Sequence, residues 1–184
     1  EVANAVDFLT GAARDARLET VTLALAGEML AIGGLVETRD AGLATARRML
    51  ESGAAAEVFG RMVVALGGPS DFIEDHGKYL ATAAITRPVA APASGHVAAI
   101  QSREIGLAVV ELGGGRRRAD DVINPAVGIT GLVDLGEPVA AGDALCLIHA
   151  DGEDALAAAE AKVLAAYEIG AAPEVPDPVL QIID

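Results

Sequence analysis

The sequence predicts an α+β fold, in which a helical N-terminal segment precedes a β-rich C-terminal domain of barrel-sandwich character with flanking helices. Apolar residues recur at steps of three and four through the first 80 residues, which is the period of amphipathic helices. From Ile85 onward, β-branched residues, prolines and glycine turns take over, as is typical of short strands. We therefore expect a helical segment over residues 1–82 and a separate α+β domain over residues 83–184.

The helical segment carries start and stop signals. One helix is expected to begin at Asp15 as N-cap and to end at Gly33-Gly34. Its predicted buried stripe consists of Leu18, Val21, Leu25, Met29 and Ile32. A second helix is expected from Asp40 as N-cap to Gly53, and a third is expected to stop at Gly67-Gly68-Pro69. The residues of the third helix that are expected to point inward are Val58, Met62, Val63 and Leu66.

The second segment reads as short strands interrupted by helices. Two strands are expected to meet near Ser94-Gly95, and Pro88 places the first of them at a sheet edge or at a strand start. Further strands are expected between residues 126 and 150. Asp151 is the predicted N-cap of a helix that Gly170 ends, and residues 178–184 alternate as a closing strand.

Composition excludes several classes of function. The net charge of −14 and the scarcity of aromatic residues argue against nucleic-acid binding. No stretch is long enough to span a membrane. Cys146 is the only cysteine and lies in an apolar run, so we expect a cytosolic protein and a buried, inert thiol. The chain starts in a helical pattern without Met, which suggests a piece of something longer.

The stretch "LGGGRRRADD" raises the question of a phosphate-binding loop. Such loops precede a helix, whereas here residues 102–112 favour a helix before the glycines, with Ser102 as N-cap. The glycines are therefore interpreted as a helix stop. The arginines are expected to be solvated or paired with Glu111, Asp120 and Asp121, and the alternative is an anion site formed by Arg116, Arg117 and Arg118.

The sequence gives little support to a metal site or to a carrier domain with an attached biotin or lipoyl group. His76, His96 and His149 are scattered without a second metal ligand at suitable spacing, so no metal site is predicted, and His149 is interpreted as structural. The run "GEPVAAGDALCLIHA" has the rhythm of a biotinyl or lipoyl carrier domain. A carrier needs a lysine in the following hairpin, but the chain has only Lys78 and Lys162. A stand-alone carrier-like module without a modifiable lysine remains the alternative.

Several long blocks together resemble one family. They are "EVANAVDFLTG", "AAEVFGRMV", "GGPSDFIEDHGKYL", "IGLAVVELGGGRRRADDVINPAVG" and "GDALCLIHA". In this order they resemble the C-terminal portion of the thymidine phosphorylase family, within the pyrimidine-nucleoside phosphorylases. The resemblance implies that residues 1–82 belong to a large α/β domain and residues 83–184 to the family's C-terminal domain. It also implies a cytoplasmic homodimer that converts thymidine and phosphate to thymine and 2-deoxyribose 1-phosphate.

The resemblance does not bring an active site with it. The family's phosphate- and base-binding residues lie in the N-terminal half, so no catalytic or substrate-binding residue is assigned and the chain alone is expected to be inactive. No cofactor is implied besides phosphate as co-substrate. Asn4 stands near the family's cation-binding glutamate without its charge, so no metal is assigned. The resemblance carries over only one role, a position beside the family's substrate cleft, which falls on Gly113, Gly114, Gly115 and Arg116.

Overall fold

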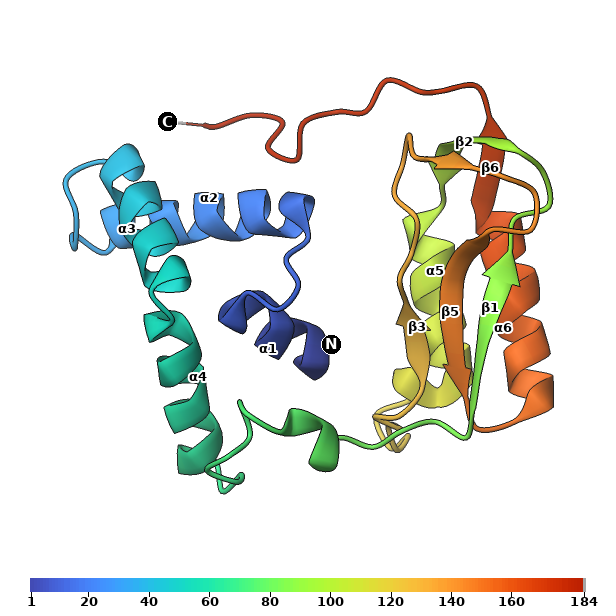
Figure 1. Ribbon diagram of the computed structural model, residues 1–184, viewed down its shortest axis with the longest axis horizontal. Coiled ribbons are helices and arrows are strands. Elements are labelled where there is room, and N and C mark those ends of the chain that lie inside the picture. The colour runs from blue at the N-terminus through green and yellow to red at the C-terminus, as the bar shows by residue number, and fades with distance from the viewer. Residues whose placement is uncertain (184) are drawn as a thin grey trace. The chain divides into compact units, whose positions relative to one another are not determined.

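The computed structural model describes residues 1–183 and confirms the α+β fold (Figure 1). The chain divides into two compact units. The first comprises residues from Glu1 to Leu80 and also the C-terminal segment that starts at Pro176, and the second runs from Ala81 to Val175. The first unit holds the helices α1 (Val2–Thr10), α2 (Ala16–Ile32), α3 (Arg39–Glu51) and α4 (Ala54–Ala65), and the 3₁₀ turn η1 (His76–Lys78). The second holds β1 (Ile85–Ala90), β2 (Gly95–Ile100), α5 (Ser102–Val109), the π-type turn η2 (Val110–Gly114), β3 (Gly128–Thr130), β4 (Pro138–Val139), β5 (Ala144–Ala150), α6 (Glu153–Ala166) and β6 (Tyr167–Gly170).

The helix boundaries in the first unit follow local capping. The Asp15 carboxylate accepts a hydrogen bond from the Leu18 amide at 2.6 Å, which confirms the predicted start of α2. The expected cap of α3 was wrong, because Thr38 accepts the Ala41 amide at 3.2 Å and Asp40 lies inside the first turn. Gly53 does not end α3 but precedes α4 in the left-handed conformation, at φ 80°.

The predicted buried stripe of α2 was wrong. Leu18, Leu25, Met29 and Ile32 are 39%, 60%, 73% and 84% exposed, and Val21 is half-buried. The buried residues of α2 are Leu23 and Gly27, on the opposite side. They face α3, where Gly27 and Gly42 bring the two backbones together and Leu23 joins a small core.

The expected inner face of α4 was also largely wrong. Val58, Met62 and Leu66 are 54%, 47% and 80% exposed, and Val63 is half-buried. The buried residue of this helix is Ala56. The packed cluster of buried apolar side chains in this unit consists of Phe8, Leu23 and Leu50. These residues come from α1, α2 and α3, so the core of this unit is very small.

The strands of the second unit form two three-stranded antiparallel sheets, with the orders β1-β5-β3 and β4-β2-β6. Among residues 1–183 they do not close into a barrel. The position of β1 at a sheet edge confirms the prediction from Pro88, because proline cannot donate to a neighbouring strand. The strands β1 and β2 meet at Ser94-Gly95 as expected, but each belongs to a different sheet.

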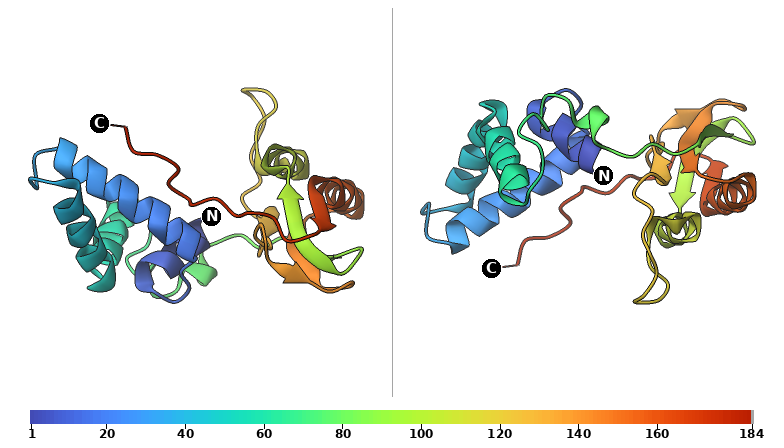
Figure 2. Two further views of the ribbon diagram at one scale, coloured as in Figure 1. Left: turned by 90° about the horizontal axis from the view of Figure 1, so that it is seen from above. Right: turned by 90° about the horizontal axis from the view of Figure 1, so that it is seen from below.

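The helices α5 and α6 contact each other and pack against the sheets (Figures 1 and 2). The side chains of this core come from both sheets and both helices and include Val89, Val97, Ala108, Leu145, Ile148, Leu156 and Val163. This core is much larger than that of the helical unit, so the second unit has the apolar burial that an independent domain requires.

Two boundaries near the C-terminus differ from expectation. The helix α6 ends at Ala166, not Gly170, and residues 167–170 pair with β2 as strand β6. Tyr167 anchors this change, since its side chain is buried and its hydroxyl donates to the Val133 carbonyl at 3.0 Å. Residues 178–183 form no strand, and residue 184 of the predicted closing strand lies outside the described residues.

Candidate functional site

The glycine–arginine loop, residues 113–121, follows the end of a helix as the sequence predicts. The helix α5 runs directly into η2, where Gly113 has φ 99°. Glycine adopts a positive φ without the steric cost that a Cβ brings to other residues, and this backbone turn ends the helix at Gly113. The residue before the helix is Gln101, and Ser102 lies inside it, so the predicted Ser102 cap was wrong.

The next two glycines are required by close packing. A Cβ on Gly114 would lie 2.9 Å from a methyl carbon of Val109, and one on Gly115 would lie 2.7 Å from a methyl carbon of Val110. The Gly113 carbonyl accepts the Asn124 amide at 2.9 Å, which closes the loop at its base. The three glycines thus fold the chain back over the end of the helix, where the dipole disfavours an anion.

The arginines of the loop are held mainly by nearby acids. Arg117 pairs with Glu111 at 3.5 Å, and Arg118 pairs with Asp120 at 3.4 Å. The Asp121 carboxylate accepts the backbone amides of residues 117 and 118, each at 2.9 Å. The expected ion-paired loop is therefore confirmed for these two arginines, although each exposed pair contributes little stability.

Arg116 differs from its two neighbours. Its Nε donates to the Asp121 carbonyl at 3.2 Å, and no carboxylate among residues 1–183 forms an ion pair with it. The loop therefore keeps one guanidinium whose charge is not neutralised by an adjacent acid.

Asp151 joins distant parts of the second unit. Its carboxylate accepts the Ala84 amide at 2.9 Å and the Asn124 side-chain amide at 2.5 Å. These bonds hold the pKa of Asp151 below its usual value, the Ala84 bond having the larger effect. Asp151 was expected to cap α6, but it ties the start of β1 to the segment that follows the glycine–arginine loop.

His149 lies on the same strand end and is satisfied by two hydroxyls. Its Nδ1 is 3.2 Å from the Thr86 hydroxyl, and its Nε2 is 2.8 Å from the Thr130 hydroxyl. Because β5 lies between β1 and β3, the imidazole bridges both edge strands. This confirms the interpretation of His149 as a structural residue.

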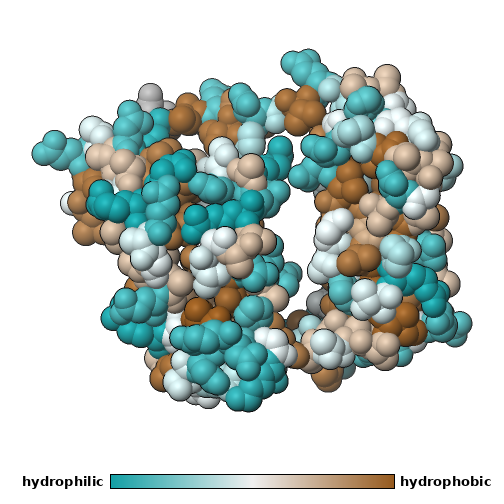
Figure 3. Space-filling model, viewed as in Figure 1, coloured by the Kyte–Doolittle hydropathy of each residue, from teal (hydrophilic) through white to brown (hydrophobic). Residues whose placement is uncertain are grey.

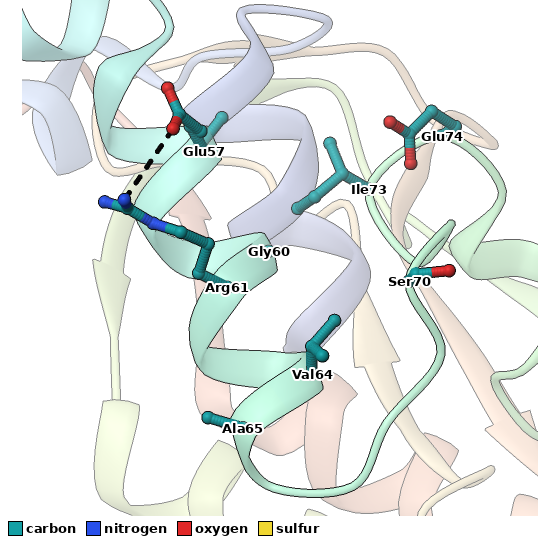
Figure 4. A pocket seen from close by; sticks show the side chains of 9 residues that line it. Glu57, Gly60, Arg61, Val64, Ala65, Ser70, Ile73 and Glu74 are labelled. Carbon is teal, nitrogen blue, oxygen red and sulfur yellow. Dashed lines mark ion pairs between the residues drawn. The ribbon is translucent and has the colours of Figure 1, made fainter.

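A shallow hollow of about 590 Å³ lies beside α4 (Figure 4). The exposed pair Glu57–Arg61, 3.8 Å apart, lies on one side of it, and Ser70 and Glu74 lie on the other. Its middle is apolar, lined by Ile73 among others. The polar groups do not converge, so the hollow lacks the arrangement that a substrate site needs.

Metal and thiol chemistry find no site in the described chain. No group of three or more His, Cys, Asp or Glu side chains among residues 1–183 could hold a metal ion. Cys146 is 1% exposed, and burial raises its pKa to about 11. The thiol therefore stays protonated near neutral pH, as expected of an inert buried cysteine.

The decisive comparison concerns the second unit. Residues 96–170 match the family model "Pyrimidine nucleoside phosphorylase C-terminal domain". Over these residues the chain is similar to that domain. The matched stretch spans the elements from β2 to β6 and includes the glycine–arginine loop.

Two curated relatives extend the likeness to the helical unit. The chain is 57% identical over 171 residues to "Thymidine phosphorylase" of Mesorhizobium japonicum, covering 93% of the chain and 39% of the relative. It is 47% identical over 186 residues to "Thymidine phosphorylase" of Burkholderia cenocepacia, covering 100% of the chain and 42% of the relative. The chain thus spans about two fifths of the length of these relatives and looks like the C-terminal part of such an enzyme.

These matches do not support the alternative of a biotinyl- or lipoyl-like module. Among residues 1–183, no helix has the length and apolar character needed to cross a membrane.

Proposed function

We propose that the chain is the C-terminal part of a thymidine phosphorylase, a pentosyltransferase that converts thymidine and phosphate to thymine and 2-deoxyribose 1-phosphate. The observation that carries the proposal is the identity of 57% and 47% to two proteins of that name over 93% and 100% of the chain. The homodimeric state, the cytoplasmic location and the use of no cofactor beyond the co-substrate phosphate follow from the same family resemblance.

The reaction sets requirements that this chain does not meet alone. A phosphate oxygen bonds to C1′ of the deoxyribose while the bond from C1′ to the base nitrogen breaks, and the leaving thymine takes up a proton. Phosphate binding needs convergent cationic or amide donors, and the base needs placed hydrogen-bond partners. We assign these groups to the N-terminal part of the enzyme, as the family resemblance implies. In the glycine–arginine loop, Arg117 and Arg118 are already paired with acids, which leaves Arg116 alone for an anion.

The isolated chain is expected to release no thymine from thymidine and phosphate. A hybrid that joins this chain to the unaligned remainder of the Mesorhizobium japonicum protein is expected to do so. Thymine release is followed by chromatography, with the intact Mesorhizobium protein as positive control. Turnover by the isolated chain above background would contradict the assignment of the active site, and a soluble hybrid without turnover would contradict the proposed activity.

We further propose that the glycine–arginine loop lies beside the substrate cleft and helps the enzyme close, with Arg116 supplying the charge. Arg116→Gln in the hybrid is expected to lower kcat/KM about tenfold, the equivalent of about 1.4 kcal/mol. Arg118→Gln is the matched control, because that guanidinium already pairs with Asp120 and its loss is expected to leave kcat/KM unchanged. Equal effects of the two substitutions would count against a specific role for Arg116.

A further inference from the structure

The helix α2 is apolar on two opposite sides. At about 100° per residue, Leu23 and Gly27 share the side that α3 covers. A second line of apolar residues, which we name the outer stripe, runs along the other side and consists of Leu18, Leu25, Met29 and Ile32. Their exposure rises along the helix from 39% to 84%.

This outer stripe is unusual for a helix at a protein surface. Scattered exposed apolar residues are common, but a continuous line of apolar residues along one side of a helix normally packs against another element. The outer stripe runs from Leu18 to Ile32, 14 steps along the helix and a rise of about 21 Å. Other large apolar side chains of the unit are exposed as well, and Figure 3 shows hydrophobic surface on it.

Both acidic residues of α2 are already paired. Glu28 pairs with Arg39, and Glu19 pairs with Arg47 at 2.9 Å, so both acids of α2 are bound to α3. A basic partner would therefore find no unpaired carboxylate on α2. A partner that presents an apolar face and stays bound permanently fits the outer stripe better than a charged one.

We propose that the outer stripe of α2 packs against an apolar face in the part of the same enzyme that precedes this chain. The inference rests on the proposed function, because it takes the chain as one part of a longer phosphorylase. It is supported by length, since the aligned regions cover 39% and 42% of the two relatives and leave about three fifths of each outside. A second copy of the chain fits less well, because four side chains on one helix offer far less than the roughly 800 Å² per partner of a standard interface.

Thiol labelling tests this proposal directly. Met29→Cys and the control Glu37→Cys, which replaces an exposed acidic residue before α3, are placed in the isolated chain and in the hybrid described above. Both cysteines are expected to react rapidly with a maleimide in the isolated chain. In the hybrid, the cysteine at residue 29 is expected to react at least tenfold more slowly, while the one at residue 37 keeps its rate. Cys146 provides little background because it is buried with a pKa of about 11.

The outcomes separate this proposal from the proposed function. Equal labelling at residue 29 in the isolated chain and in the hybrid would overturn it. Protection in the isolated chain that disappears on dilution, together with a dimeric mass, would assign the outer stripe to a second copy and also overturn it. Protection in a hybrid without thymine release would support the packing surface and count against the proposed activity. If the hybrid is insoluble, peptide-level mass spectrometry of the intact Mesorhizobium protein, carrying cysteine at the aligned position, gives the same readout.

Discussion

Replacing Gly42 with alanine is expected to unfold the helical unit while the second unit stays folded. A Cβ at this position would overlap the carbonyl oxygen of Gly27 and stand 2.9 Å from its carbon. The reciprocal contact is also too close, because a Cβ on Gly27 would lie 2.8 Å from the Leu43 amide nitrogen. Both obstacles are backbone atoms, so no side-chain rotation relieves the clash.

The only relief for the Gly42→Ala variant is separation of α2 from α3. That movement weakens the packing of Leu23 and Leu50, and the small core of this unit leaves little reserve. Overpacking of this kind costs about 3 kcal/mol, a large fraction of the stability of a small unit. Hydrogen exchange with mass spectrometry is expected to show loss of protection in α2 and α3, with protection in α5 and α6 unchanged.

Gly106→Ala is the matched control. Gly106 also lies inside a helix, but no atom stands within 4 Å of the position its Cβ would take. Alanine is therefore expected to stabilise α5 by about 0.5–1 kcal/mol, because it reduces the entropy of the unfolded chain. Protection of α2 and α3 that survives in Gly42→Ala would show that their close approach is not needed.

The sequence predicts the helices well because their signals are local. The cap at Asp15 and the stop at Gly33 need only neighbouring residues, and both are seen. The side on which α2 is buried could not be obtained in this way. The apolar residues of α2 lie on two opposite sides of the helix. Which side is buried against α3 depends on the close contact of Gly27 with Gly42, and no periodic pattern in the sequence reveals that contact.

The candidate site shows the same division between local and distant contacts. The ion pairs of the glycine–arginine loop were predictable, because Glu111 and Asp120 are close in sequence to the arginines they bind. Asp151 was assigned to a cap from its position before a helix. Its bond to the amide of Ala84, 67 residues away, depends on the pairing of β1 with β5, which local patterns do not reveal.

The end of α6 shows a third limit of local reasoning. Residues 153–170 contain no proline, and the sequence favours one uninterrupted helix as far as Gly170. Tyr167 and Ile169 instead pair with β2, because an extended backbone there completes a sheet and buries the tyrosine ring. The gain from this tertiary pairing exceeds the helix propensity of a few residues.

Truncation of Leu145 to alanine is expected to give the largest single loss of stability in the second unit. Leu145 lies in β5, the central strand of its sheet, and its side chain is fully buried in the larger core. Leucine-to-alanine changes at such sites cost about 2–5 kcal/mol, because they remove apolar contacts and leave a cavity. Leu147 on the same strand is 37% exposed, so Leu147→Ala removes the same atoms from a partly solvated site and is expected to cost less than about 1 kcal/mol.

Urea unfolding followed by circular dichroism, with hydrogen exchange to assign the transition to this unit, measures both Leu→Ala variants. A lower midpoint at unchanged slope is expected for Leu145→Ala, since the surface exposed on unfolding stays nearly the same. The two leucines share chemistry, strand and sheet and differ mainly in burial. Equal losses would mean that the packing of β5 against the helices does not determine the stability of this domain, and would place its stability in the turns and loops between the strands.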